Sequence, residues 1–390
     1  MRSAPLQRRP SEPRTNSRET ADDPRSALTK WADVDVRALS DNARALLAHV
    51  GDGVALLLMV KANGYGHGMV TAARAGLAGG ATWLGVSCAE EALALRSDGI
   101  DAPVLVTGWS NPRLVPDLVE AGVDITVYDL DTVEAALAGA RASRRTARIH
   151  LKVDTGMGRL GARHDDVTDL CRRVVAGRSV AQLRGVFTHF ASAEDDDEFT
   201  SAQHARFLCA LDVALQHAPD ALVHAANSAA ALMRPRTWHD LVRVGIAYYG
   251  YPPVAGHAVD LRPALTVVAR VTQVRTMARG DSAGYGRTWI SPGGARIATV
   301  ALGYADGVLR TLGNRGAMVV RGVRVPIVGR VSMDQVTIDV SDVDGVQPGD
   351  EAVYIGPDID ADDVAVMADT IPNDVLCAIS SRVPRMVVGE

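Results

Sequence analysis

The chain has 390 residues, more than one hydrophobic core usually organises, so two domains are expected. Apolar residues make up 47% of the chain, yet no segment approaches the roughly 18 uninterrupted apolar residues of a membrane span. A net charge of −5 without a long single-sign block gives no sign of a nucleic-acid or membrane-binding surface, and therefore favours a small-molecule partner. The cysteines lack metal-ligand spacing, so we expect free thiols in a reducing compartment and no metal site. They are Cys88, Cys171, Cys209 and Cys377.

Residues 1–30 differ in composition from the rest of the chain. They are rich in Arg, Ser, Pro and Glu and have too few large apolar side chains to offset the entropy of ordering, so a disordered tail is predicted. Arg8 and Arg9 could begin a twin-arginine export signal, but no apolar stretch follows them within the segment. We therefore expect a cytoplasmic protein, whose tail is either functional or the product of an upstream start codon.

Residues 31–258 show short apolar runs that alternate with amphipathic, helix-like segments. Eight such runs in roughly 200 residues predict a (β/α)8 barrel, although an open doubly wound sheet gives the same local pattern. Asp33–Val50 is expected to form an additional helix before the first strand. The eight runs are Val54–Val60, Trp83–Cys88, Val104–Val106, Ile125–Tyr128, Ile149–Val153, Gly185–Phe190, Leu222–Ala226 and Val242–Tyr248.

Residues 259–390 have a different sequence pattern, with β-branched runs separated by Gly and Pro and little helical periodicity. This pattern predicts a second, mainly β domain, in which only Asp362–Asp369 reads as a helix. The runs are Leu265–Val274, Ile297–Leu302, Ala317–Val328, Val336–Val340 and Ala352–Ile355.

Lys61 is the first candidate for chemistry. It directly follows the run Val54–Val60, and in a barrel the residues just past the carboxyl ends of the strands face the active site. The segment 61–68 contains three glycines, which permit tight turns and close backbone approach to a ligand. A solvated lysine capping a strand would look the same in isolation, but a lysine at a barrel mouth is also placed to bind pyridoxal phosphate covalently.

Phosphate donors follow two later runs. Asn227 and Ser228 are placed to cap a helix, where a hydroxyl and free N–H groups meet the positive end of the helix dipole. Gly245 and Ile246 lie in the region of the eighth strand, where barrels often bind phosphate. Each signal is weak alone, and together they are compatible with a pyridoxal-phosphate site.

Seven motifs make the chain similar to a known family. They occur in the order seen in bacterial alanine racemases, and the resemblance extends from about Trp31 to Arg385. It implies a pyridoxal-phosphate barrel followed by a β domain, head-to-tail homodimers with shared active sites, and interconversion of L- and D-alanine for D-alanine biosynthesis by a two-base mechanism. The motifs are the segments 60–68, 151–161, 188–191, 243–246, 284–286, 302–307 and 332–335.

The resemblance assigns the two bases and the partner of the cofactor ring. Lys61 resembles the lysine that holds the cofactor and moves the proton on one face of the substrate, and Tyr285 resembles the base on the other face, contributed by the partner subunit. Arg243 is similar to the residue that meets the pyridine nitrogen. Arg does not give up its proton at ordinary pH, so the ring stays unprotonated and delocalises the carbanion less than it would beside an acidic partner. Arg243 therefore favours racemisation.

A tyrosine base needs assistance, because its reference pKa is about 10. By resemblance, His189 and Arg243 would supply it through a chain Tyr285–His189–Arg243, although a histidine at a strand end is more often a structural hydrogen-bonding group. Further roles come from the resemblance alone. Arg159 would contact the phenolic oxygen of the cofactor and the substrate carboxylate, and Lys152 matches a lysine that is carbamylated in some members. The remaining matches are Met333, Asp334 and Tyr304 for the substrate, and Tyr65, Asn227, Ser228, Gly245 and Ile246 for the cofactor.

The sequence departs from the family near its end. Asn373-Asp374 stands where members have a Tyr-Glu pair, and Ser381 replaces a tyrosine that contacts the phosphate and narrows the substrate pocket. This widens the expected substrate range toward residues such as serine without changing the reaction type.

Two other functions compete with racemisation. One is decarboxylation of a basic amino acid on the same barrel type, where a carboxylate is expected in place of Arg243. The other is a non-catalytic carrier of pyridoxal phosphate, which would have no second domain to supply Tyr285.

Overall fold

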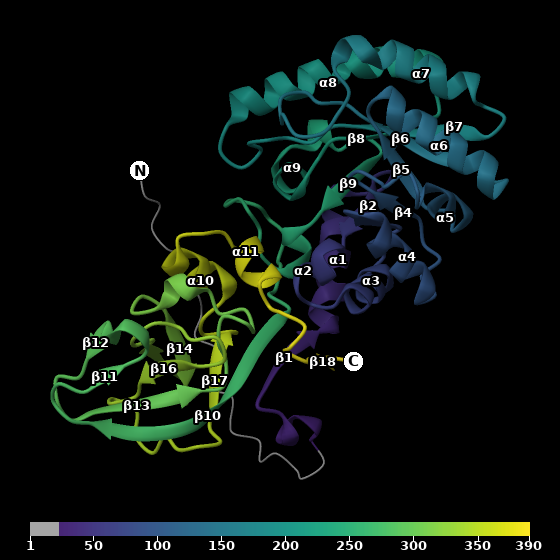
Figure 1. Cartoon of the computed structure of the whole chain (residues 1–390). Helices are drawn as coiled ribbons and strands as arrows, with labels where there is room; N and C mark the ends of the chain where they lie inside the picture. The colour runs from purple at the N-terminus through teal and green to yellow at the C-terminus, as the bar shows by residue number, and fades with distance from the viewer. Residues whose placement is uncertain (1–22) are drawn as a thin grey trace. The chain divides into compact units, whose positions relative to one another are not determined.

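The computed structural model describes residues 23–390, and its backbone divides into two compact units. Of the described residues, the β-rich unit comprises 23–34 together with Leu265–Met386, and the barrel unit comprises Asp35–Ala264 together with Val387–Glu390. Within the described residues, no helix is long and apolar enough to cross a membrane. Figure 1 gives the labels used below.

The barrel unit is built on eight parallel strands whose hydrogen-bonded order is β8-β7-β6-β5-β4-β3-β2-β9. Nearly all of their residues are buried, as expected of parallel strands covered on both faces. The predicted barrel fold is therefore confirmed (Figure 1). The strands are β2 (Ala55–Met59), β3 (Trp83–Val86), β4 (Val104–Val106), β5 (Asp124–Val127), β6 (Ala147–Lys152), β7 (Ala181–Phe187), β8 (Leu222–His224) and β9 (Leu241–Val244).

Helices connect these strands. The eighth predicted run extended to Tyr248, but β9 ends at Val244 because the next residues turn into the short 3-10 helix η4 (Ile246–Tyr249). The α-helices are α1 (Val36–Val50), α2 (Lys61–Tyr65), α3 (Met69–Ala78), α4 (Ala89–Ser97), α5 (Val115–Glu120), α6 (Leu130–Ser143), α7 (Val167–Ala176), α8 (Asp197–His217) and α9 (Ser228–Met233). The other 3-10 helices are η2 (His164–Asp166) and η3 (Pro235–Thr237).

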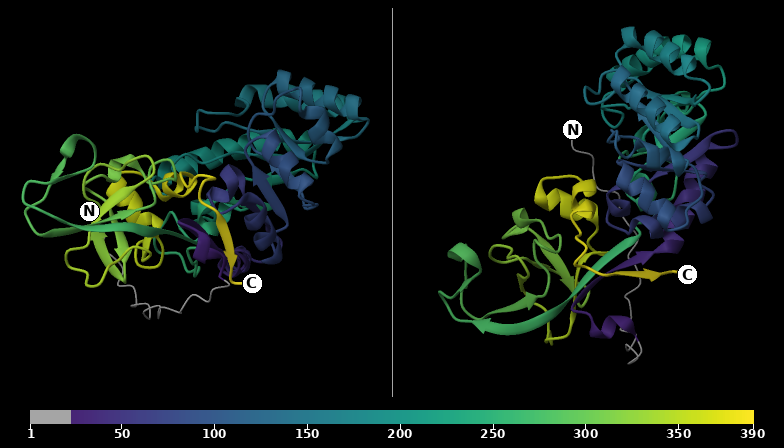
Figure 2. Two further views of the ribbon diagram at one scale, coloured as in Figure 1. Left: turned by 60° about the horizontal axis from the view of Figure 1, so that its bottom comes forward. Right: turned by 45° about the vertical axis from the view of Figure 1, so that its right-hand side comes forward.

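The β-rich unit is organised by one long strand, β10 (Leu265–Met277), which pairs antiparallel with β1, β13 and β17. Figure 2 shows this strand curving along the unit. The mainly β second domain is thus confirmed. The other strands are β1 (Lys30–Asp35), β11 (Ser282–Ala283), β12 (Trp289–Ile290), β13 (Ala295–Val300), β14 (Ala317–Val320), β15 (Val323–Pro326), β16 (Val336–Asp339), β17 (Glu351–Ile355) and β18 (Arg385–Val388).

The predicted helix at 362–369 corresponds to α10 (Ala361–Ala368), whereas α11 (Pro372–Cys377) was not predicted. Proline at its first turn is tolerated because that N–H has no partner inside the helix. Three 3-10 helices, η1 (Pro24–Ala27), η5 (Tyr285–Arg287) and η6 (Arg310–Leu312), complete the described elements of this unit.

The chain before α1 differs from the prediction. Of the expected tail, residues 1–22 lie outside the described residues, but the segment from Asp23 onward has defined structure. Asp23 caps η1, Arg25 pairs with Asp33 at 3.3 Å, and the strand β1 begins at Lys30. The helix expected from Asp33 begins only at Val36, because residues 30–34 pair with β10. Composition does not reveal a pairing with a strand more than 200 residues away.

Candidate active site

The predicted cofactor residues gather at the carboxyl ends of the barrel strands. Lys61 follows β2, Lys152 ends β6, and His189 follows β7. Ser228 and Gly245 follow β8 and β9. Because parallel strands present their carboxyl ends at one edge of the sheet, these residues share one side of the barrel, where barrel enzymes have their active sites.

Lys61 begins a strained turn. Ala62, Asn63 and Tyr65 have positive φ angles of 52°, 54° and 48°, a conformation that costs non-glycine residues about 1 kcal/mol or more each. Two side chains hold the turn in place. Ala62 N donates to Glu91 Oε1 at 2.7 Å, and Met69 N donates to Asn63 Oδ1 at 3.1 Å. Backbone strain of this kind is typical of functional sites, and it supports a functional role for Lys61 over that of a solvated cap.

A second cluster of polar groups surrounds Gly245. Gly245 N donates to Ser228 Oγ at 2.9 Å, and a Cβ atom added at Gly245 would lie 2.6 Å from the hydroxyl oxygen of Tyr65. Glycine is therefore required here by space. The ring of Tyr65 stacks on Tyr249 with 4.8 Å between centroids. The structure brings the predicted phosphate ligands together, with Ile246 next in the chain.

Asn227 has a structural role next to this cluster. Its side-chain oxygen accepts from Ala230 N at 3.0 Å and caps α9, as the sequence predicted for this position. The cap fixes the start of α9 and hence the backbone that carries Ser228.

Arg243 is held by four acceptors in the barrel interior. Its guanidinium donates to the carbonyl oxygens of Thr188 and Ala225 at 2.7 and 3.2 Å. It also donates to Nδ1 of His189 at 3.3 Å and Nδ1 of His224 at 3.0 Å. Burial lowers the pKa of Arg243 to about 9, so the group remains a cation at neutral pH. The part of the predicted chain that joins His189 to Arg243 is therefore present.

Several cations act on one another around this arginine. Burial, followed by the charges of Arg243 and Arg159, lowers the pKa of Lys152 to about 8. Burial and the same cations hold the pKa of His189 well below its ordinary value, so His189 is neutral. Arg159 itself is exposed. This concentration of positive charge suits an anionic ligand.

The remaining predicted residues lie on the β-rich unit, where they are exposed. Tyr285, in η5, has 72% of its surface accessible, and the corresponding fractions are 52% for Met333 and 42% for Tyr304. The backbone joins the last two, because Tyr304 N donates to Ser332 O and Ala305 N to Met333 O, both at 3.0 Å.

Residues near the end of the β-rich unit contact the segment that carries Met333 and Asp334. Asp334 accepts from Arg382 at 2.7 Å, and Ser381 is exposed directly before that arginine. Arg382 also lies 3.3 Å from the buried carboxylate of Asp306, which Lys30 contacts at 2.7 Å.

Sequence reasoning missed His224, Arg382 and Asp306. The signal for His224 was a polar residue inside the apolar run Leu222–Ala226. Asp306 lies inside the motif 302–307 and Arg382 directly follows Ser381, but nothing in their spacing shows that they meet.

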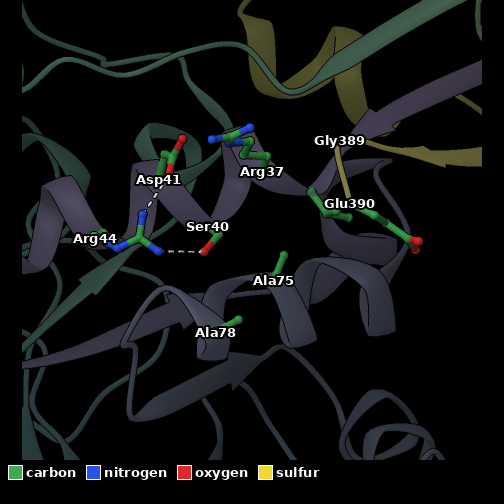
Figure 3. Close-up of a pocket in the computed structure, with 9 residues that line it drawn as sticks. Arg37, Ser40, Asp41, Arg44, Ala75, Ala78, Gly389 and Glu390 are labelled. Carbon is green, nitrogen blue, oxygen red and sulfur yellow. Dashed lines mark hydrogen bonds and ion pairs between the residues drawn. The ribbon is translucent and has the colours of Figure 1, made fainter.

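A separate cavity of about 500 Å³ lies on the barrel unit and is lined by α1, α3 and the end of the chain (Figure 3). It is open to solvent, and two of its four charged side chains, Asp41 and Arg44, are paired at 2.6 Å. None of the predicted site residues lines it, so it is not the site described above.

Comparison with known proteins decides the family. Residues 34–253 match the alanine racemase N-terminal domain, and residues 264–387 match the alanine racemase C-terminal domain. The chain belongs to the alanine racemase family. Members of the alanine racemase family are isomerases that depend on pyridoxal phosphate.

Individual alanine racemases cover nearly the whole chain. Those of Thermobifida fusca and Symbiobacterium thermophilum are 43% and 42% identical, each over 92% of this chain and 98% and 97% of their own. The alanine racemase structure from Streptomyces coelicolor has a TM-score of 0.89 at 36% identity, covering 94% of this chain and all of that one. The structure from Bartonella henselae, with covalently bound pyridoxal phosphate, has a TM-score of 0.83 at 29% identity and covers 93% of this chain and 100% of that one.

The barrel residues fit the cofactor of the alanine racemase family. The hydroxyls of Tyr65 and Ser228 and the backbone at Gly245 are hydrogen-bonding groups that suit a phosphate, and the cations Lys152, Arg159 and Arg243 suit the anionic oxygens of the cofactor ring and of a substrate carboxylate. Arg243 presents only donors to a ring nitrogen, which accepts when unprotonated.

Proposed function

We propose that this chain interconverts L- and D-alanine, with Lys61 and Tyr285 of the partner subunit as the two bases. The observation that carries the proposal is the buried guanidinium of Arg243, fixed by four acceptors where a decarboxylase of this barrel type would be expected to have a carboxylate. A group fixed this firmly and still cationic at neutral pH cannot protonate the ring nitrogen, which disfavours the competing chemistry.

Each cofactor contact can be given to a residue. Lys61 would hold pyridoxal phosphate covalently, and its phosphate would bind at Tyr65, Ser228, Gly245 and Ile246. Arg243 would meet the ring nitrogen, and Arg159 the phenolic oxygen and the substrate carboxylate. When bound, pyridoxal phosphate withdraws electrons from the α carbon and so acidifies the α proton.

The two bases then exchange protons with the α carbon from opposite faces. Lys61 Nζ would be free to act as a base once the substrate amine has replaced it on the cofactor. In one direction Lys61 Nζ would then remove the α proton and the Tyr285 hydroxyl would deliver one to the other face, and in the other direction the roles reverse. Nδ1 of His189 accepts from Arg243, so the proton of this neutral ring is on Nε2. Nε2–H is then a donor that could hydrogen-bond to the side-chain oxygen of Tyr285.

Lys152 is suited to carbamylation. With a pKa of about 8 it has a substantial neutral fraction at neutral pH, and only the neutral amine attacks carbon dioxide. Starting from the ammonium form, one proton leaves to give the neutral amine and a second leaves as the N–C bond to carbon dioxide forms, so a cation among cations becomes an anion. Attraction to Arg159 and Arg243 would replace repulsion.

A homodimer with shared active sites follows from the same assignment. Tyr285, Tyr304 and Met333 are exposed on their own chain, as expected of residues that complete the site of a partner. The active protein would be a cytoplasmic homodimer that supplies D-alanine and, because of Ser381, tolerates serine.

Two measurements test the reaction and its cofactor lysine. The dimer with added pyridoxal phosphate should racemise L-alanine in a screen of the common L-amino acids, whereas release of carbon dioxide from a basic amino acid would favour the decarboxylase. Borohydride reduction followed by peptide mapping should label Lys61. Labelling of another lysine with Lys61 unmodified would contradict the assignment.

A further inference from the structure

A row of buried side chains continues from Arg243 into the barrel, away from the residues assigned above. Nδ1 of His224 accepts from Arg243 at 3.0 Å, and its Nε2 lies 2.9 Å from Nδ1 of His150. Nε2 of His150 lies 3.2 Å from Oδ1 of Asp124. Asp124, His150 and His224 are all at most 1% exposed. The four side chains come from β5, β6, β8 and β9, so the row crosses the barrel core.

The two ends of this row determine where its protons are. Arginine has only donors, so His224 must accept at Nδ1 and carry its proton on Nε2. That proton is donated to Nδ1 of His150, which therefore also carries its proton on Nε2. The carboxylate of Asp124 has only acceptors and receives it. Every hydrogen bond points from Arg243 toward Asp124, and both imidazoles are neutral between a cation and an anion.

The surrounding strands are shaped to hold this row. A Cβ atom at Gly185 would lie 2.4 Å from Nδ1 of His150, so glycine at this position leaves room for the imidazole. The register between β6 and β7 shifts at Ile149 and His150, which is how the strands accommodate Arg184. His224 stacks on Phe187 at 4.7 Å with 7° between the rings.

Asp124 is held at the far end by two further cations. Arg184 and Arg148 lie 3.1 and 3.3 Å from its carboxylate. Both are donors, so neither competes with Asp124 for the proton of His150. Either arginine can be removed without reversing the direction of the row.

We propose that Asp124 and His150 are positioning residues for Arg243, which they orient by fixing the tautomer of His224. The proposal rests on the proposed function in one respect, namely that Arg243 meets the cofactor ring. A carboxylate at position 124 forces His150 to donate toward it. An amide at the same place can donate to Nε2 of His150, which would reverse both histidines and set a His224 N–H against a donor of Arg243. An aspartate that fixes a histidine tautomer in this way has a large effect when it becomes asparagine.

The direct test reads the tautomers of the full-length protein, with and without pyridoxal phosphate. Long-range proton–nitrogen spectra of protein carrying ring-¹⁵N histidine should show His150 and His224 protonated on Nε2. Asp124→Asn should convert part or all of both to the Nδ1 form, whereas the matched control Arg148→Gln, which removes a contact to the same carboxylate, should leave them unchanged. Unchanged tautomers in Asp124→Asn would overturn the proposal.

Variants at His150 keep the test decisive if Asp124→Asn does not fold. In His150→Gln the amide can accept from His224 and donate to Asp124, so the tautomer of His224 should be retained. In His150→Leu the row is cut and only Arg243 still favours the Nε2 form of His224, so a fraction of the Nδ1 form should appear. Equal spectra for the two variants would contradict a positioning role.

Kinetics supply the second readout. Asp124→Asn should lower kcat on the order of 10²-fold, less than the roughly 10⁴-fold of a histidine in direct contact with the nucleophile, with KM changed much less. Arg148→Gln should stay within a few-fold of the wild type. If the wild type racemises no amino acid, the proposed function fails, whereas the tautomer measurement still decides this inference.

Discussion

The two units present their functional residues in opposite ways. In the barrel unit Arg243 is only 5% exposed and its guanidinium has four acceptors within its own unit. In the β-rich unit Tyr285 is 72% exposed. A buried group with fixed partners is positioned by its own unit, whereas an exposed group acquires its position from whatever later covers it. The comparison locates preorganisation in the barrel, and under the proposed function the β-rich unit would complete the site of the partner subunit.

Charge is also distributed differently in the two units. Among the barrel residues, Lys152 lies near the like charges of Arg159 and Arg243, and burial together with these charges lowers the pKa of Lys152. In the β-rich unit the carboxylates of Asp306 and Asp334 are balanced by Lys30 and Arg382. The barrel thus keeps an excess of positive charge that an anionic ligand would neutralise, and the β-rich unit keeps none at the corresponding residues.

The largest expected effect comes from separating the two bases. Lys61→Ala and Tyr285→Ala should each reduce racemisation by at least about 10³-fold, because each removes a proton-transfer group. Mixing the two inactive proteins and allowing subunits to exchange should restore about a quarter of wild-type activity, since half of the dimers are mixed and each then has one site with both bases. Activity is measured in the mixture and again in mixed dimers isolated with two affinity tags, for which about half of wild-type activity is expected. Isolated mixed dimers without activity would contradict a shared site.

A second prediction concerns stability and follows from the difference in burial. Arg243→Met should lower the free energy of unfolding of the cofactor-free protein by about 3–5 kcal/mol, because it leaves buried acceptors without donors. The matched change in the β-rich unit, Tyr285→Phe, should stay within about 0.5 kcal/mol of the wild type. Urea unfolding of the three proteins measures both values. Similar losses of unfolding free energy in the two variants would mean that the exposure of Arg243 and Tyr285 in the single chain does not determine how much each contributes to stability.

The sequence predicted the barrel well because its strands are nearly continuous apolar runs, and Val104–Val106 coincides with β4. Resemblance then identified residues that converge, such as Ser228 and Gly245. What it did not identify depends on contacts between distant parts of the chain. The pairing of β1 with β10, the meeting of Arg382 with Asp306, and the row from His224 to Asp124 have no local signature, since each residue type is common and each spacing is arbitrary.

A third prediction uses the pH dependence of stability to measure how far burial and the neighbouring cations lower the pKa of Lys152. The folded pKa of Lys152, about 8, is below the ordinary value of 10.5, so between these pH values the unfolded chain binds more protons and the stability of the folded chain rises with pH. Relative to Lys152→Met, the cofactor-free wild type in buffer without carbon dioxide should gain about 1–3 kcal/mol between pH 8 and pH 10.5. Denaturant unfolding of both proteins across this range measures the difference. An equal pH dependence would show that Lys152 titrates as it does in water.

Carbamylation of Lys152 can be detected with the same pair of proteins. After incubation with ¹³C-bicarbonate, the wild type should show a carbamate carbon signal that is missing from Lys152→Met. A signal in both proteins would assign the carbamate to another amine.

The smallest expected effect tests whether the β-rich unit influences substrate choice through Ser381. This residue is exposed directly before Arg382, which donates to Asp334 at 2.7 Å, so position 381 adjoins the loop proposed to contact substrate. A tyrosine there would occupy space that water or a polar side chain can fill, and one such pocket contact shifts discrimination by roughly 1–3 kcal/mol at most. Ser381→Tyr should therefore lower the ratio of kcat/KM for serine to kcat/KM for alanine by about tenfold. Ser381→Ala serves as the control, because it removes the hydroxyl while keeping the space and should lower the ratio far less. If Ser381→Tyr leaves the ratio unchanged or raises it, the altered segment around Asn373 already fills the pocket, and substrate choice is determined elsewhere.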